Sequence, residues 1–199
     1  FNKGILPVAV ATAMFGAGVA SAADFYLTSD ATISDLPSKN ATTDYIVNNN
    51  STLSTNSSMT VYYGTIDGVA LINDSSRGGT VAIGGNLTMH GNIGATNATG
   101  NFTISNGNTL TLASNVSTFN SDNMTLSDNT VLNFGNVTSG YNRGSSETLT
   151  FASNITMGSN STINVGGGTT LNGNIYGTSD GAGTLNVLGN FTSTGSIGA

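Results

Sequence analysis

Few residues of this sequence are suited to acid–base chemistry. His90 is the only histidine, Glu147 is the only glutamate, and the sequence has no cysteine. General acid–base catalysis needs a group that titrates near the working pH, or a carboxylate perturbed towards it. A Ser-His-Asp triad or a histidine metal site would therefore have to use His90. The absence of cysteine excludes a disulfide framework and a thiolate metal site.

Aspartates are the remaining candidates. Asp122, Asp128 and Asp180 stand beside Gly, Ser or Asn, a context in which Asp usually forms an Asx turn with its own main chain. A glycosidase needs two carboxylates flanking the scissile bond. A β-helix can bring distant aspartates together, so a secreted polysaccharide hydrolase or lyase stays open as an alternative. We nevertheless predict no catalytic, metal-binding or cofactor-binding residues.

His90 lies in a stretch that the chain uses twice. Residues 79–95 read GTVAIGGNLTMHGNIGA and residues 183–199 read GTLNVLGNFTSTGSIGA, with nine of seventeen positions identical. Thr194 replaces His90 in the second copy, so we expect His90 to be a solvated strand residue. Apolar residues at alternate places give the two-residue period of a strand, and Gly-Asn then marks a turn. The copies predict an array of similar strand–turn units, in which stacked neighbours bury a shared core.

The same alternation assigns an inward and an outward face to each strand. Val81, Ile83 and Val187 are expected to face the core, and Thr194 to face solvent. Aspartate at Val187 would then bury an unpaired carboxylate, at a cost of several kcal/mol.

A second motif, Asn-Φ-Thr with Φ apolar, recurs along the chain. It begins at Asn86, Asn101, Asn123, Asn154 and Asn190. The runs from the middle three continue alike, and each predicts a strand, an Asn-containing turn and a second strand, because Asn tolerates left-handed backbone. The starts are 15, 22, 31 and 36 residues apart, which indicates coils of different length. We expect this irregularity to prevent the regular rows of Thr-x-Thr pairs that an ice-binding face would need. We attribute most of the N-x-S/T glycosylation sequons to chance.

Composition indicates a β protein of low charge. Asn, Thr, Ser and Gly account for 108 of 199 residues, and charged residues for only 7%. Short β-branched runs separated by Gly and Asn are typical of all-β structure. The net charge is −6, and the only basic residues are Lys3, Lys39, Arg77 and Arg143. Nucleic acid is therefore a poor partner, because phosphate binding needs clustered cations.

Two architectures could absorb the expected strands. An antiparallel sandwich blunts its sheet edges with Lys, Pro or bulges, yet Lys39 and Pro37 are the only lysine and proline after residue 22. In a parallel β-helix each strand pairs with its counterpart one coil along, and Thr and Asn can form ladders. We therefore predict an all-β fold, a right-handed parallel β-helix (β-solenoid) with irregular coil lengths. Its handedness follows the rule for parallel connections.

The N-terminus predicts export. Lys3 precedes an apolar run from Ile5 to Val19, and Ala20-Ser21-Ala22 fits the small-residue rule of signal-peptide cleavage sites. The run is shorter than the roughly 20 residues that span a bilayer as a helix. We predict a signal peptide over residues 1–22, cut between Ala22 and Ala23.

The chain after the predicted cleavage site divides into two parts. Residues 23–59 carry weak signals, with a first strand expected at 25–27, and we assign them to an N-terminal cap and first irregular coils. Residues 60–199 carry the β-helical repeats, with strands expected at 61–63, 69–72 and 80–83. Because the second copy of the repeat stops at its last residue, we expect the sequence to be a fragment truncated at its C-terminus.

The run from Thr169 to Ala199, TTLNGNIYGTSDGAGTLNVLGNFTSTGSIGA, resembles the passenger repeats of rickettsial surface-antigen autotransporters of the outer-membrane protein A and B type. The matching features are the G-N-I-x-G-T turn, the G-T-L-N-Φ strand and the closing T-G-S-I-G-A, and residues 79–95 carry the same pattern. The resemblance implies a secreted β-helical passenger, displayed on a Gram-negative surface by a C-terminal β-barrel outside this sequence. It carries over no individual functional residue.

These observations predict an exported bacterial cell-surface protein, a fragment of an autotransporter-type passenger with a structural and adhesive role, and not an enzyme. Its expected partners are a host-cell or neighbouring-cell surface, protein or glycan, and the outer membrane through the barrel that the resemblance implies. No cofactor is expected. A surface-layer or fibre-forming structural protein is one alternative, and the secreted β-helical polysaccharide hydrolase or lyase is the other.

Overall fold

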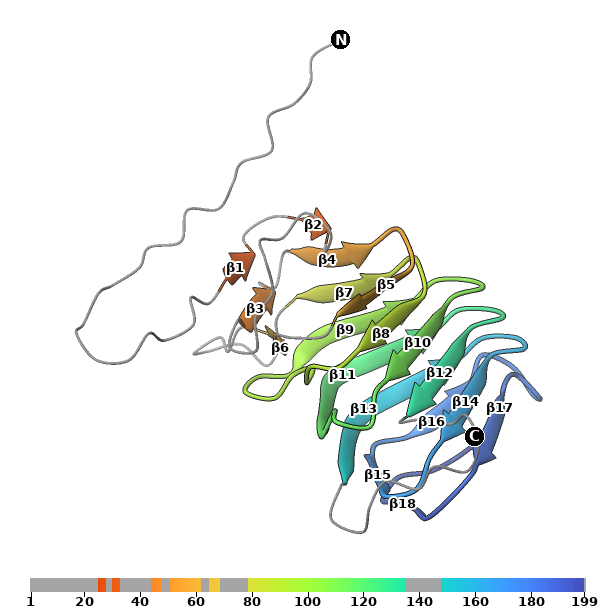
Figure 1. The fold of residues 1–199 in the computed structure, drawn as a ribbon. Helices are drawn as coiled ribbons and strands as arrows, with labels where there is room; N and C mark the ends of the chain where they lie inside the picture. The colour runs from red at the N-terminus through yellow and green to blue at the C-terminus, as the bar shows by residue number, and fades with distance from the viewer. Residues whose placement is uncertain are drawn as a thin grey trace.

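A computed structural model describes residues 25–27, 30–32, 44–47, 51–61, 65–68, 79–134 and 148–198 (Figure 1). Within these ranges the chain is all β, with many short parallel strands. No helix long and apolar enough to cross a lipid bilayer is present in this part of the chain. The predicted signal peptide, its cleavage site at Ala22 and Ala23, the strand expected at 69–72 and Glu147 lie outside the described residues.

Three strand positions recur in a fixed order along the chain, and one passage through all three is named a coil. The first position holds β1 (Phe25–Leu27), β3 (Asp44–Val47), β6 (Thr65–Gly68), the bridge residue Ile93, the first parts of β11 (Thr118–Leu126) and β13 (Leu149–Met157), β15 (Thr169–Asn172) and β18 (Phe191–Ser193). The second position holds β2 (Ala31–Thr32), β4 (Thr52–Thr55), β7 (Thr80–Ile83), β9 (Thr99–Ile104), the second parts of β11 and β13, β16 (Ile175–Gly177) and the bridge residue Ile197. The third position holds β5 (Met59–Val61), β8 (Leu87–Met89), β10 (Thr109–Leu112), β12 (Val131–Phe134), β14 (Thr162–Val165) and β17 (Thr184–Val187).

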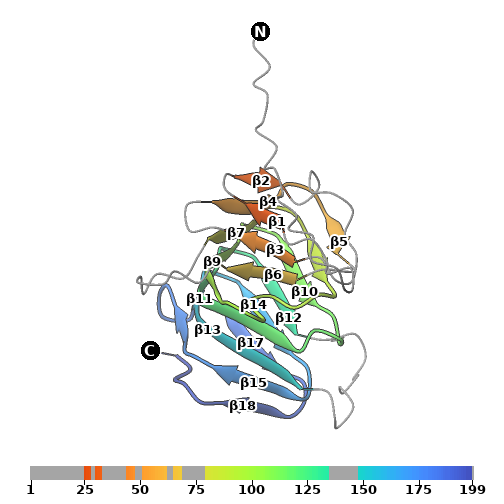
Figure 2. The ribbon, with the colours of Figure 1, turned by 90° about the vertical axis from the view of Figure 1, so that its left-hand side faces the viewer.

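Each described strand pairs in parallel with the strand of the same position one coil away (Figures 1 and 2). The number of residues per coil varies. Phe102 pairs with Met124, 22 residues on, whereas Met124 pairs with Ile155, 31 residues on. The longer coil takes its extra residues between β12 and β13, so strand register is kept. The predicted all-β fold with parallel strands and irregular coil lengths is confirmed, and the antiparallel sandwich is excluded for these strands.

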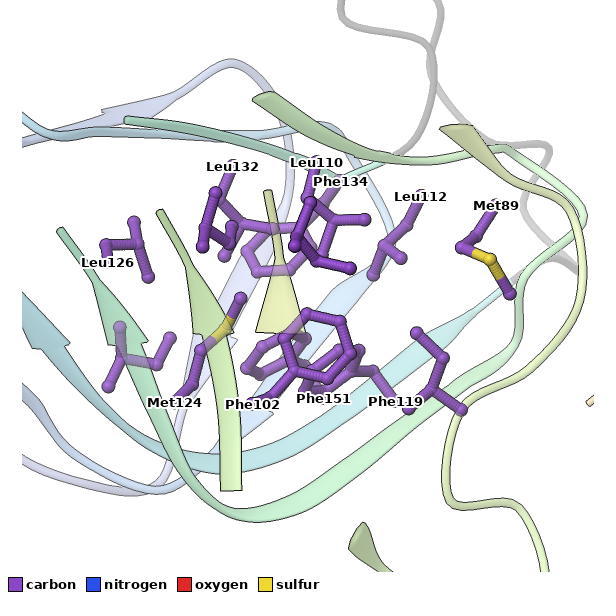
Figure 3. Close-up of a cluster of buried hydrophobic side chains, with 14 of the residues drawn as sticks. Met89, Phe102, Leu110, Leu112, Phe119, Met124, Leu126, Leu132, Phe134 and Phe151 are labelled. Carbon is purple, nitrogen blue, oxygen red and sulfur yellow. The ribbon is translucent and has the colours of Figure 1, made fainter. Parts of the chain in front are cut away.

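Side chains alternate between the inside of the coils and the surface, as the two-residue period predicts. In the middle coils the inward positions bring four phenylalanine rings together (Figure 3). Phe119 and Phe151 stack at a centroid distance of 4.3 Å, and Phe102 and Phe134 each meet one of them edge-on. Such pairs contribute about 0.5–1.5 kcal/mol each beyond the burial of their area. The continuous core also includes Val81, Ile83, Leu87, Leu110, Leu112, Leu132, Met124, Ile155, Ile163 and Val165.

The three runs that begin at Asn101, Asn123 and Asn154 each form a strand, a turn and a second strand, as predicted. The turns connect the second position to the third, and each contains one residue with positive φ. These residues are Gly107 (76°), Asn129 (57°) and Asn160 (55°). The turn between β16 and β17 is two residues longer and has positive φ at both Gly181 (74°) and Gly183 (81°). Asn and Gly recur here because they adopt left-handed backbone at the lowest steric cost.

The two copies of the repeat do not occupy the same strand positions. Residues 79–95 pass through the second position in β7, the third in β8 and the first at Ile93. Residues 183–199 pass through the third position in β17, the first in β18 and the second at Ile197. The repeated unit therefore specifies a strand, a corner and a strand, and this unit fits at different corners of the coil.

Val187 does not have the burial that the repeat predicts. It pairs in register with Val165, which is fully buried, yet Val187 is 50% exposed, and Leu188 and Ile197 are similarly exposed. Among the described residues no strand pairs with the far side of β17. The inward direction predicted for Val187 agrees with its register partner, but the predicted burial is not seen, because no further coil among the described residues covers it.

Candidate functional site

His90 lies just after β8 and connects two coils. Its Nδ1 is 3.1 Å from Oδ1 of Asn115, and Nδ2 of Asn115 donates to the backbone oxygen of His90 at 2.7 Å. The side chain is half-buried. His90 follows the last residue of β8, so the expectation of a strand residue is wrong by one position, whereas its side chain does remain in contact with solvent. The observed contacts give His90 a structural role.

Two of the described aspartates also form contacts between coils. Oδ1 of Asp128 accepts a hydrogen bond from the backbone nitrogen of Ser159 at 2.8 Å, and Oδ1 of Asp30 accepts one from Thr52 at 2.8 Å. The partner of Asp128 lies 31 residues away, so this contact is not the local Asx turn that the sequence context predicts. Within the described ranges no group of three His, Cys, Asp or Glu residues could hold a metal ion.

Asparagine ladders connect successive coils among the described residues. On the third-position strands, Nδ2 of Asn164 donates to Oδ1 of Asn133 at 2.9 Å, and Nδ2 of Asn186 donates to Oδ1 of Asn164 at 2.8 Å. Asn133 in turn donates to Oγ1 of Thr111 at 3.3 Å. Each of these asparagine amides donates a hydrogen bond to the preceding coil. Asn133 and Asn164 also accept a hydrogen bond from the following coil. The amides therefore stabilise the stack and are already hydrogen-bonded within it.

A second ladder runs along the turns between the second and third positions. Nδ2 of Asn129 donates to Oδ1 of Asn106 at 3.2 Å, and Nδ2 of Asn160 donates to Oδ1 of Asn129 at 3.4 Å. These asparagines are exposed, so the ladder lies on the surface of the corner.

The Asn-Φ-Thr motifs of the middle coils align on the outer face of the second-position strands. Asn101, Asn123 and Asn154 are in register and exposed. The apolar residue that follows each of them is buried, and Thr103, Thr125 and Thr156 form the next column outward. The sequon pattern N-x-T at these positions is thus the out–in–out alternation of a strand. We name the columns formed by these six residues the Asn–Thr face.

Ranked columns form even though coil length varies. On the third-position strands Thr109, Val131, Thr162 and Thr184 are partners in register, and so are Thr111, Asn133, Asn164 and Asn186. Strand register is kept because the extra residues fall between strands. The columns nevertheless mix Thr with Val and Asn, so the third-position strands form no ranked Thr-x-Thr array. The sequence predicts that Asn and Thr can form ladders, but not which residues form them, because variable coil length hides which residues become neighbours.

Comparisons with protein-family models, with curated proteins and with solved structures give no match. The chemical character of the surface is therefore inferred from the residues of this chain alone. The described ranges contain no lysine, arginine or glutamate, and their columns consist mostly of hydroxyl and amide side chains. Such a surface can exchange hydrogen bonds with neutral groups of a protein or a glycan.

Proposed function

We propose that this protein is an exported bacterial cell-surface protein, an autotransporter-type passenger with a structural and adhesive role. The observation that carries the proposal is the unbroken parallel register of the second position from β2 to Ile197. A stack in which each coil contacts only its neighbours can be extended along one axis. A long surface of this kind spreads weak contacts over many coils and gains avidity from many displayed copies.

We assign the stack to the right-handed parallel β-helices. Parallel pairing one coil along, a continuous inner core and side-chain ladders support the assignment. The right-handed path follows the handedness rule for connections between parallel strands. A crystal structure that showed a left-handed path would contradict it.

The Asn–Thr face is the binding surface that the geometry favours. Asn101, Asn123 and Asn154 are exposed there, although Oδ1 of Asn154 accepts hydrogen bonds from the backbone and side-chain nitrogens of Asn174 at 3.2 Å. By contrast, Asn133 and Asn164 of the third-position ladder are half-buried and bonded to one another. Exposed neutral amides and hydroxyls suit a neutral protein or glycan on a host or neighbouring cell. A nucleic acid is not proposed, because its phosphates would find no lysine or arginine among the described residues.

We further propose that the protein is not an enzyme. The contacts of His90 and Asp128 account for both side chains structurally. General acid–base catalysis would need such a group aimed at a substrate, whereas adhesion through many weak contacts does not.

The adhesion proposal is tested with purified protein immobilised on beads and presented to host cells or to a neutral glycan array. Thr125→Lys places a charge in the centre of the Asn–Thr face at an exposed position, so the fold is kept. Thr150→Lys is the matched control, because Thr150 is an exposed strand residue of the first position. We expect Thr125→Lys to reduce binding about tenfold or more by placing an unpaired, desolvated charge in the contact, and Thr150→Lys to leave it unchanged.

Other outcomes favour the alternatives. Filaments or ordered sheets of the purified protein, without cell binding, would support the surface-layer or fibre protein. Turnover of a polysaccharide that is lost in His90→Ala or Asp128→Asn would support the hydrolase.

Export is tested separately. Ala22→Asp should block removal of the predicted signal peptide, because the cleavage site needs a small side chain. N-terminal sequencing that finds a mature start other than Ala23 would contradict the predicted cleavage site.

A further inference from the structure

The sequence contains two Asn-Gly pairs, Asn106-Gly107 and Asn172-Gly173. Glycine has no side chain that could shield its own backbone nitrogen. An asparagine side chain therefore reacts with the next backbone nitrogen most readily when the next residue is glycine. The fold places the two pairs in very different surroundings. We propose that Asn106 is a site of spontaneous deamidation, and that the fold protects Asn172.

The reaction uses only the chain and water. The backbone nitrogen of Gly107 attacks Cγ of Asn106 and forms a C–N bond. The bond between Cγ and Nδ2 breaks, and Nδ2 takes up the proton of the Gly107 N–H and leaves as ammonia. Water then opens the cyclic imide at one of its two carbonyl groups. The product at residue 106 is aspartate or isoaspartate, with one negative charge in place of a neutral amide.

The surroundings of Asn106 favour this reaction. Asn106 and Gly107 are exposed at a turn tip, and a side chain added at Gly107 would meet nothing within 4 Å. Nδ2 of Asn129 donates to Oδ1 of Asn106 at 3.2 Å, which draws electron density from the carbonyl that is attacked. The nitrogen of Gly107 donates to the backbone oxygen of Asp128 at 3.2 Å. This bond lies at the surface and must open before the nitrogen can attack.

The surroundings of Asn172 oppose the reaction. Asn172 is the last residue of β15 and pairs with Ala152 of β13. Gly173 has φ 153°, and the place of its missing Cβ lies against the backbone oxygen and carbon of Ser153. Oδ1 of Asn172 accepts a hydrogen bond from Oγ1 of Thr194 at 3.3 Å, as Oδ1 of Asn106 does from Asn129, so this contact does not distinguish the two sites. Ring closure there requires β15 to separate from β13.

The two products have different consequences for the turn. The tight turn at Ser179, Asp180 and Gly181 has the same local form as that at Ser105, Asn106 and Gly107. The nitrogen of Ala182 donates to the oxygen of Ser179 at 3.0 Å, as that of Asn108 does to Ser105 at 3.2 Å, and both glycines have a similar positive φ. Aspartate is therefore compatible with this turn. Isoaspartate lengthens the main chain by one carbon, so it should break the bond from the nitrogen of Asn108 to the oxygen of Ser105.

The test is peptide mapping by mass spectrometry after the full chain is incubated in mildly alkaline buffer, folded or in denaturant. Deamidation adds one mass unit, and an isoaspartyl methyltransferase identifies the isoaspartate. In the folded protein we expect Asn106 to react at least ~10-fold faster than Asn172, whose reaction waits for strand separation. In denaturant the two should react at similar rates.

The control variant is Asn106→Gln, which keeps the amide but needs a larger ring, and it should show no mass increase at residue 106. Equal rates at Asn106 and Asn172 in the folded protein would overturn the proposal. So would an Asn106 that stays intact while the denatured chain reacts.

Discussion

The middle coils and the last described coil place apolar side chains at the same inward positions, and yet their burial differs. Val165 of β14 is fully buried, whereas its register partner Val187 of β17 is half exposed. Phe119 is buried between Phe102 and Phe151, whereas Phe191 of β18 only packs against the edge of the core. In this fold, burial of an inward residue therefore depends on a neighbouring coil as much as on the residue's own strand.

The largest expected effect comes from a carboxylate at these two register partners. Val165→Asp should lower the free energy of unfolding by several kcal/mol, because it buries a charge with no partner. Val187→Asp should cost about 1 kcal/mol or less, because its carboxylate can stay in water. Urea unfolding followed by circular dichroism measures both. Equal losses would show that a further coil, or another molecule, covers β17 in solution.

Removal of an aromatic ring should show the same contrast with a smaller amplitude. Phe119→Ala deletes a ring that contacts two others and should cost about 3–5 kcal/mol through the cavity left behind. Phe191→Ala, at the half-covered end, should cost less than half as much. The comparison of denaturation midpoints at equal m-values tests this. A Phe191→Ala loss as large as that of Phe119→Ala would contradict the idea that coverage sets the cost.

The asparagine ladder offers a polar version of the comparison. Asn164→Ala removes a donor to Asn133 and an acceptor for Asn186, so about 1–3 kcal/mol should be lost. Asn186→Ala removes only one bond at an exposed position, and about 0.5–1.5 kcal/mol should be lost. Thermal unfolding of the two variants and the double variant gives the coupling energy. A coupling near zero would show that the ladder contributes nothing to stability.

The smallest effect is expected on the outer face of the last coil. Thr194 is exposed, and its hydroxyl bonds to the backbone oxygen of Leu171 and to Asn172. Thr194→Asp should change the free energy of unfolding by under ~1 kcal/mol, since the carboxylate remains in water. Calorimetry of this variant beside Val165→Asp checks the inward and outward assignment. A loss of several kcal/mol would place residue 194 inside.

The sequence allowed the local structure to be predicted, because strands and turns are decided by neighbouring residues. The alternation around Val81 and Ile83, and the strand–turn–strand units that begin at Asn101, Asn123 and Asn154, are confirmed. Partners across coils could not be predicted, since coil length varies and the register cannot be counted along the chain. The ladder of Asn133 and Asn164 and the contact between His90 and Asn115 belong to this second class. The assignments of the signal peptide, the N-terminal cap and export stay predictions.

The placement of the repeat at different corners has a consequence for how genes of this kind can change length. A duplication or deletion of whole coils would leave every later loop on its original side of the molecule. A duplication or deletion of a single strand–corner unit would instead turn all later loops about the long axis to the neighbouring side, while every strand still found a parallel partner. Recombination at such short repeats could therefore present the same loop sequence in a new direction without a single change to the core.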